Sequence, residues 1–280
     1  MSLLMEPLVQ RMLLAGLLVG VASPVVGTYL VQRRMALLGD GIGHVALAGV
    51  AAGWLAGSAA GMAQRDALAV PGAIIFAVAG AVAIERMRSK GAAADVVMAI
   101  LFYGGIASGV LLIGLAGGSN ANLLGYLFGS ISTVTWVDVW LTGGLAVAIL
   151  IVGLGLRPAL FAVTHDQEFA RSTGLPVAVL NMVVAILAAV TITVAMRVVG
   201  VLLVSALMIL PVAIAEQFTH RFSRTMHVAM GIGAILTLTG VAITLEHDLQ
   251  PGALIVVLGV AAYVLTNIGA GVVRRVRGTP

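Results

Sequence analysis

Asp40 and His44 are the residues of this sequence whose types and spacing most directly suggest chemistry. They belong to the stretch 39–44, which reads Gly-Asp-Gly-Ile-Gly-His. Residues four positions apart lie on the same face of a helix. A carboxylate oxygen and a neutral imidazole nitrogen are both ligands for divalent metal ions. The pair therefore predicts a point of contact with a metal ion.

The composition makes this pair more informative than it would be in a water-soluble protein. Hydrophobic residues make up 61% of the chain and charged residues 9%. A charged group in the hydrocarbon region costs about 2.5–3.5 kcal/mol on insertion scales, and a passing divalent cation would offset that cost. Gly39, Gly41 and Gly43 remove side chains from around the pair, as an ion path requires. The alternative is that Asp40 caps the helix while His44 bonds to a neighbour.

Two ligands are too few to hold a metal ion alone. If two copies of the chain meet at this face, two Asp40 and two His44 side chains supply four ligands. The chain contains no cysteine, so thiolate metal sites and disulfides are excluded.

The elements that must position this pair are membrane-spanning helices. Repeated apolar runs of about 17–25 residues have the length of bilayer spans. The expected fold is all-α, a polytopic transmembrane helical bundle in which residues 1–280 form one transmembrane domain without a soluble nucleotide-binding domain. Eight full spans are the alternative to nine, because glycine and proline interrupt some segments. The nine segments are Leu8–Val31, Ala36–Leu55, Leu68–Ile84, Val96–Leu115, Val137–Leu156, Val177–Met196, Val199–Ala215, Met226–Leu245 and Gly252–Val273.

Small and basic residues add two expectations about this bundle. Glycines four positions apart, such as Gly16 and Gly20, Gly49 and Gly53, or Gly105 and Gly109, indicate closely packed helices. Lysine and arginine are concentrated in alternate connections, which assigns those connections and the C-terminus to the cytoplasm. The basic residues of these connections are Arg33, Arg34, Arg86, Arg88, Lys90, Arg157, Arg171, Arg221, Arg224, Arg274, Arg275 and Arg277.

Four motifs in order along the chain carry a resemblance to a known family. The stretch 33–51 is the first, and the stretch 124–131, Leu-Gly-Tyr-Leu-Phe-Gly-Ser-Ile, is the second. The third is the stretch 165–174, His-Asp-Gln-Glu-Phe-Ala-Arg-Ser-Thr-Gly, and the fourth is the stretch 199–211, which begins Val-Gly-Val-Leu-Leu-Val. Together they resemble the integral-membrane permeases of ABC importers for zinc, manganese and iron, the ABC-3 family.

This resemblance implies a transport subunit and not an enzyme. Such a permease forms a homodimeric, multi-pass channel in the plasma membrane of a prokaryote. In a cell with two membranes, this is the inner membrane. A separate cytoplasmic ABC ATPase hydrolyses ATP, and an extracytoplasmic metal-binding protein delivers the metal. No cofactor is expected to be tightly bound. Asp40 and His44 fall on the family's metal-contacting positions.

The resemblance favours zinc over manganese as the transported ion. Manganese-type members usually carry proline before the glycine that follows the histidine, and this chain has Ala48 before Gly49. The absence of that proline resembles the zinc-type members. A mixed nitrogen and oxygen site suits several divalent ions, so manganese and iron remain alternatives.

The polar segment 216–225 is the first choice for coupling to the ATPase. In importers resembling the vitamin B12 system, a short helix after the corresponding proline-containing span docks into the ATPase, which places a coupling helix at Ala215–Thr225. The alternative is a turn at the lipid surface with snorkelling arginines. The residues expected to couple are Glu216, Phe218, Arg221, Phe222 and Arg224.

Other polar residues are weaker candidates. Glu246, His247 and Asp248 form a possible outer site that receives metal, or merely a solvated loop. His165 lies beside Asp166 and is expected to have a structural role. Glu85 is expected to form an interfacial ion pair with the arginines that follow it.

Two other classes of function are less well supported by the sequence. An intramembrane metalloprotease would use a His-Glu-x-x-His helix, and His-Glu occurs nowhere in the chain. A stand-alone secondary transporter fits the composition, but it would be supported by internal repeats, and none is convincing.

Overall fold

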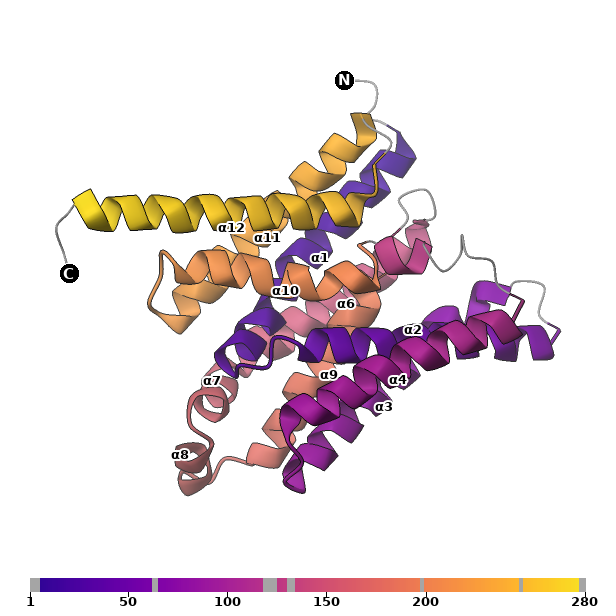
Figure 1. Ribbon diagram of the computed structural model, residues 1–280, viewed down its shortest axis with the longest axis horizontal. Coiled ribbons are helices and arrows are strands. Elements are labelled where there is room, and N and C mark those ends of the chain that lie inside the picture. The colour runs from indigo at the N-terminus through magenta and orange to yellow at the C-terminus, as the bar shows by residue number, and fades with distance from the viewer. Residues whose placement is uncertain are drawn as a thin grey trace.

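The computed structural model is a helical bundle, and the structure describes residues 6–61, 65–117, 125–129, 134–196, 199–246 and 249–276. These residues contain helices and connecting turns but no strand, so the predicted all-α fold is confirmed. Figure 1 shows that the helices cross one another at varied angles. They are α1 (Pro7–Gln32), α2 (Leu38–Ala59), the short 3-10 helix η2 (Arg65–Leu68), α3 (Ala69–Ser89), α4 (Ala94–Leu115), α6 (Trp136–Gly155), α7 (Arg157–His165), α8 (Gln167–Ser172), α9 (Val177–Ala195), α10 (Val201–Glu216), α11 (Phe222–Glu246) and α12 (Pro251–Val276).

Within the described residues, eight helices are long and apolar enough to cross a membrane, namely α1, α2, α3, α4, α6, α9, α11 and α12. The predicted span Val199–Ala215 corresponds to α10, which has only 16 residues where a span needs about 20. Gly200 precedes α10 with a φ of 90°, a conformation that separates α10 from α9. By length, eight helices qualify as full spans, and the shorter α10 returns the chain across the bundle to the end where α11 begins (Figure 1).

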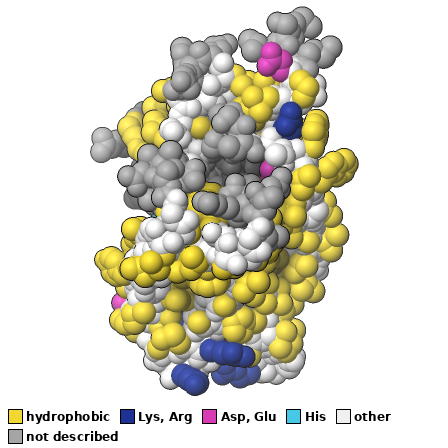
Figure 2. Space-filling model, turned by 90° about the vertical axis from the view of Figure 1, so that its right-hand side faces the viewer, with side chains coloured by type: hydrophobic (Ala, Val, Ile, Leu, Met, Phe, Trp, Pro, Cys, Tyr) yellow, Lys and Arg dark blue, Asp and Glu magenta, His cyan; other side chains and the backbone are white. Residues whose placement is uncertain are grey.

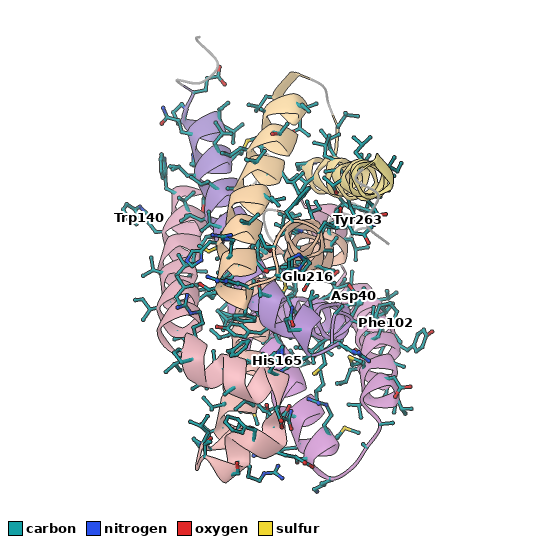
Figure 3. The ribbon with its side chains drawn as sticks, turned by 90° about the vertical axis from the view of Figure 1, so that its left-hand side faces the viewer. Asp40, Phe102, Trp140, His165, Glu216 and Tyr263 are labelled. Carbon is teal, nitrogen blue, oxygen red and sulfur yellow. The ribbon has the colours of Figure 1, made fainter. Side chains whose placement is uncertain are left out.

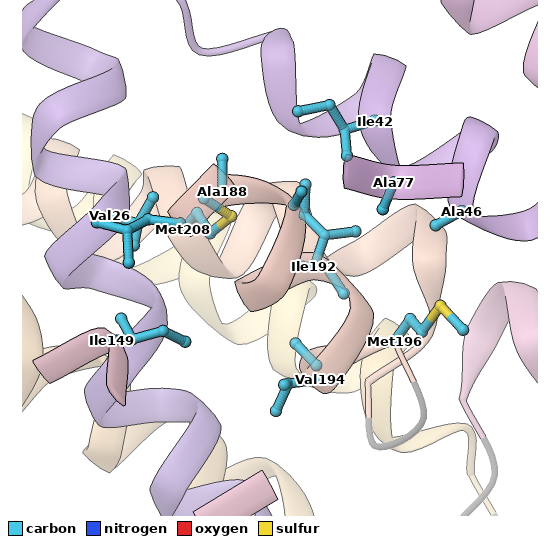
Figure 4. Packing of buried hydrophobic residues seen from close by; sticks show 14 of the residues in the cluster. Val26, Ile42, Ala46, Ala77, Ile149, Ala188, Ile192, Val194, Met196 and Met208 are labelled. Atoms are coloured by element: carbon cyan, nitrogen blue, oxygen red, sulfur yellow. The ribbon is translucent and has the colours of Figure 1, made fainter. Parts of the chain in front are cut away.

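Three helices form the centre of the bundle. In the most apolar 18-residue stretch of each helix, the share of buried residues is 72% in α1 and 67% in both α2 and α9, but only 17% in α12. The outer helices expose large hydrophobic side chains, and Figure 2 shows a broad surface of them above a basic lower end. This is the pattern of helices facing lipid. Figure 4 shows part of the core, with Val26 of α1, Ile42 of α2, Ala77 of α3, Ile192 of α9 and Met208 of α10.

Small residues allow these helices to approach closely, as the glycine spacing predicts. Gly27 of α1 lies against the Met208 carbonyl group of α10, where a Cβ atom would clash with that oxygen. Gly49 of α2 contacts Gly72 of α3 in the same way. The predicted pairs Gly16/Gly20, Gly49/Gly53 and Gly105/Gly109 each face a neighbouring helix, so their role in packing is confirmed.

The predicted basic connections meet at one end of the bundle, which we call the basic end. Arg33, directly after α1, donates to Asn181 Oδ1 of α9 at 2.6 Å and to Thr164 Oγ1 of α7 at 3.3 Å. Burial lowers the pKa of Arg33 to about 10, so this guanidinium stays charged at neutral pH. In Figure 1 the connections from α1 to α2, from α3 to α4, from α6 to α9 and from α10 to α11 all lie toward the lower left.

Two further hydrogen bonds join the helix ends there. Gln32 donates to Glu216 Oε1 at 2.7 Å, which ties the end of α1 to the end of α10. Arg157 donates to Ser223 Oγ at 2.7 Å, which ties α7 to the start of α11. The ends of α1, α7, α9, α10 and α11 at the basic end are thus joined by side-chain hydrogen bonds.

Candidate metal-contacting site

Asp40 and His44 share one face of α2, as their spacing predicts. Asp40 belongs to the first turn of the helix and is half-buried, while His44 is 3% exposed one turn further on. Figure 3 shows Asp40 near the middle of the molecule when it is viewed from the side of the basic end.

Two other helices flank this face of α2. On one side is α4, whose Gly105 lies so close to His44 that a Cβ atom would come within 2.6 Å of the His44 carbonyl carbon. On the other side is α10, which Gly39 and Gly43 approach at Ser205 and Val201. Gly39, Gly43 and Gly105 therefore bring α2 close to its neighbours. Asp40 and His44 lie between α4 and α10.

The imidazole of His44 is held by an aromatic ring. Phe102 of α4 lies edge-to-face with it at 4.5 Å between ring centroids. Among the described residues His44 Nδ1 has no hydrogen-bond partner although it is buried. A buried polar nitrogen without a partner costs free energy, and a bound ion is one of the explanations for such an atom. The alternative that His44 bonds to a neighbouring side chain finds no partner among these residues.

One copy of the chain does not complete a metal site. The described residues contain no group of three or more histidine, cysteine, aspartate or glutamate side chains that would hold a metal ion. Asp40 and His44 would supply only two ligands, so the expectation that a second copy supplies the other two stays a prediction.

The structure replaces the predicted coupling helix at Ala215–Thr225 with a turn. α10 ends at Glu216, α11 begins at Phe222, and the residues between them form no helix. Phe222 faces inward, 5.4 Å from the Tyr29 ring and 4.9 Å from the Phe161 ring between centroids. Its ring is therefore used for packing inside this chain.

The other residues of this segment stay accessible at the basic end. Phe218 is 60% exposed and Arg224 is exposed. Glu216 and Arg221 line a cavity of about 510 Å³ beside Phe222. Their role in coupling is not tested by this geometry and stays a prediction.

Two short helices that the sequence analysis missed, α7 and α8, occupy the connection between α6 and α9. Asp166 caps α8 by accepting from the backbone N–H groups of Glu168 and Phe169. His165 stacks on Phe161 with 5.0 Å between ring centroids. These contacts agree with the structural role expected for His165. The missed signal was the capping pattern, in which an aspartate precedes a short helical segment.

The possible outer metal site falls mostly outside the described residues. His247 and Asp248 lie beyond them, and Glu246 is the last residue of α11. Glu85 forms the expected ion pair with Arg88, at 3.2 Å between Oε2 and Nη1. It is 9% exposed, and so it is more deeply buried than an interfacial pair would be.

Comparison with known proteins gives a family and a matching fold. A model of the ABC 3 transport family matches residues 5–270. The manganese transport system membrane protein MntC of Halalkalibacterium halodurans is 31% identical over 94% of this chain and 88% of its own length. The manganese import system permease protein ScaB of Streptococcus parasanguinis is 28% identical over 92% of this chain and 89% of its own length.

A solved structure also matches this chain in fold. The structure described as PsaBC from Streptococcus pneumoniae in complex with Fab matches with a TM-score of 0.82 at 26% identity, covering 95% of this chain and 92% of that one. The family match spans nearly the whole chain and confirms the predicted resemblance, so the subunit carries out transport and is not itself an enzyme. The chain therefore belongs to the ABC 3 transport family, the integral-membrane permeases of ABC importers.

Proposed function

We propose that this chain is the permease subunit that carries a divalent transition-metal ion into a prokaryotic cell. The observation that carries the proposal is His44, whose buried Nδ1 has no partner among the described residues, one helical turn from the half-buried Asp40. Neutral imidazole nitrogen and carboxylate oxygen are ligands that such ions prefer. Relatives named for manganese transport or import support a metal cargo.

Zinc and manganese are the two ions to separate. The sequence argument for zinc is Ala48, which stands where manganese-type members usually have proline. The relatives MntC and ScaB are named for manganese, which supports manganese equally well. Donor chemistry does not decide between them, because a site of imidazole and carboxylate groups suits both ions.

The transport mechanism we propose is alternating access by an assembled complex. An extracytoplasmic binding protein delivers the ion, the ion meets the Asp40/His44 face, and ATP-driven motion of a cytoplasmic ATPase opens the path inward. The glycine contacts of α2 with α4 and α10 support this, because smooth helix surfaces permit small sliding movements. Such motion shifts a population between two arrangements of the same helices.

We further propose that two copies of the chain place their α2 faces toward a shared path. Leu37 precedes α2, is 64% exposed and lies on the same side of the helix as Asp40 by its spacing. The chain has no cysteine, so Leu37→Cys introduces a single thiol. A short bis-maleimide should link two chains of this variant, whereas Ile75→Cys, 65% exposed on α3, should stay unlinked.

For coupling we propose a surface made of two neighbouring parts of the basic end. One is the turn between α10 and α11, with Phe218, Arg221 and Arg224, and the other is α8 with Phe169. Both phenylalanines are 60% exposed, and an exposed aromatic side chain beside basic residues is a common anchor for a protein partner. On this proposal the C-terminus and the basic end face the cytoplasm, in accordance with the positive-inside rule.

The decisive experiment is metal uptake by the complex reconstituted in vesicles. Uptake of zinc and of manganese is measured separately and then in competition, with and without ATP. The proposal expects ATP-dependent uptake of at least one ion, and the competition identifies which ion is preferred. Uptake that proceeds equally without the ATPase and ATP would instead support a stand-alone secondary transporter.

A further inference from the structure

A separate cavity opens at the basic end among the ends of three helices. It has a volume of about 290 Å³ and lies between the end of α3, the helix α8 and the start of α9. Its lining is rich in polar groups. The polar side chains are those of Glu85, Arg88, Ser89, Gln167, Arg171 and Asn181.

The charges of this lining favour an anion. Arg88 is paired with Glu85, the only carboxylate in the lining, at 3.2 Å. Arg171 lines the cavity as well and leaves it with one positive charge in excess. A metal cation would meet a carboxylate that is already neutralised, together with two guanidinium groups, so cation binding is disfavoured.

The hydrogen-bonding groups of the lining are also mostly donors. Asn181 is 7% exposed, and its Oδ1 accepts the 2.6 Å hydrogen bond from Arg33 Nη2. Its carbonyl oxygen is therefore engaged, so the hydrogen-bonding capacity that remains to this lining residue is mainly that of its amide NH₂ donors. Arg171 and Gln167 add further N–H donors. Planar guanidinium groups match phosphate oxygens particularly well, because they donate two parallel hydrogen bonds.

The position of the cavity indicates where such a phosphate comes from. α3 ends at Ser89 and α9 begins at Val177, so the cavity lies at the level where two spans leave the hydrocarbon, close to the polar headgroups. Apolar surface continues beside it, since Met87 is 39% exposed and Val179 is 59% exposed. A lipid whose headgroup occupies the cavity would thus place its acyl chains beside apolar side chains.

We propose that this cavity binds the phosphate group of an anionic phospholipid headgroup. Basic pockets between spans at a membrane surface are suited to such headgroups. The volume is roughly ten times the share of about 30 Å³ that one water molecule takes up in the liquid, which accommodates a phosphate with part of its headgroup. A bound lipid then bridges α3, α8 and α9, the helix ends that flank Arg33.

The test compares lipid retention by variants of the full chain. The protein is taken into nanodiscs of phosphatidylcholine alone or of an equal mixture of phosphatidylcholine and phosphatidylglycerol, and the lipids that remain bound after gentle delipidation are counted by native mass spectrometry. Arg171→Gln removes the exposed guanidinium of the cavity. Arg86→Gln is the matched control, because Arg86 is exposed near the same helix end but does not line the cavity.

The wild-type chain should retain phosphatidylglycerol in preference to phosphatidylcholine. Arg171→Gln should lower that retention about fivefold, the effect of one charge worth about 1 kcal/mol near a surface. Arg86→Gln should retain lipid like the wild type, and Arg171→Lys should keep most of the retention. Thermal unfolding of each variant checks that the fold is intact.

Three results would overturn the proposal. Equal loss of retention in Arg171→Gln and Arg86→Gln would indicate general surface charge in place of a site. Equal retention of the two lipids by the wild type would show that no anionic headgroup is selected. Stabilisation of lipid-free protein by inorganic phosphate alone, lost in Arg171→Gln and with no preference for phosphatidylglycerol, would assign the cavity to a free anion.

Discussion

The surroundings of His44 and the basic end are held together by different forces. Around His44, α2 meets α4 and α10 through Gly105, Gly39 and Gly43, and between described residues no side chain of α2 hydrogen-bonds to another helix. At the basic end, Arg33 and Gln32 fix several helix ends by directed hydrogen bonds. Directed bonds break when helices shift, whereas smooth packing tolerates small shifts. On the proposed function, the face with Asp40 and His44 would move while the basic end transmits force.

The largest expected effect comes from filling the contact between α2 and α4. Gly105→Ala places a methyl group 2.6 Å from the His44 carbonyl carbon, and overpacking of this kind typically costs about 1–3 kcal/mol. The helices separate at His44, so metal uptake by the reconstituted complex should fall together with thermal stability.

The neighbouring residue gives the matched control for that variant. A Cβ atom at Gly104 meets no atom within 4 Å. Gly104→Ala should therefore gain up to about 1 kcal/mol from better helix propensity and keep normal uptake. If both variants behave alike, the close approach of α4 at His44 has no role in transport.

An intermediate effect is expected from Arg33→Lys, which tests the hydrogen bonds of the basic end. Lysine keeps the charge but lacks the planar fork by which two separate nitrogens of Arg33 reach Thr164 and Asn181. Loss of charged hydrogen bonds at a partly buried site costs about 1.5–3 kcal/mol. The melting temperature of the purified permease should fall, and less uptake should be obtained per ATP hydrolysed.

Arg34→Lys serves as its control, since Arg34 is exposed next to Arg33. This variant should match the wild type in both measurements. A ratio of uptake to ATP hydrolysis that is unchanged in Arg33→Lys would show that the basic end stabilises the fold without transmitting force.

The smallest effect on the isolated permease is expected at the exposed aromatic residues. Phe169→Ala and Phe218→Ala remove side chains that are 60% exposed, so permease stability should change by less than about 0.5 kcal/mol. Binding of the ATPase, measured by co-purification and by titration, should weaken by more than about tenfold if these rings are anchors that cost 2 kcal/mol or more on truncation. Trp140→Ala, 78% exposed on α6, should leave ATPase binding unchanged.

Much of the bundle was predictable because spans have a fixed length and an apolar composition. The segment Leu8–Val31 corresponds to α1 and Val137–Leu156 to α6 within a few residues. The segment Val199–Ala215 corresponds to α10, which begins after Gly200 with a φ of 90°, a conformation that hydropathy does not register.

The site was predictable only along one helix. The spacing of Asp40 and His44 places both on one face, and the structure agrees. Phe102 was not predictable, because it reaches His44 through the packing of α4 on α2, which a local pattern does not encode. The inward packing of Phe222 was not predictable for a similar reason, since its ring meets Tyr29 and Phe161 from distant segments.

Metal uptake by variants of Asp40 and His44 tests the central claim most directly. Asp40→Asn and His44→Gln keep the size of each side chain but weaken it as a ligand, and His227→Gln is the control, because His227 is exposed and its Nδ1 lies 2.6 Å from the Ser223 carbonyl oxygen. The account predicts that either site variant lowers uptake by more than about tenfold while the complex assembles and binds ATP, and that His227→Gln transports normally. A double variant that assembles and imports metal at the wild-type rate would contradict it.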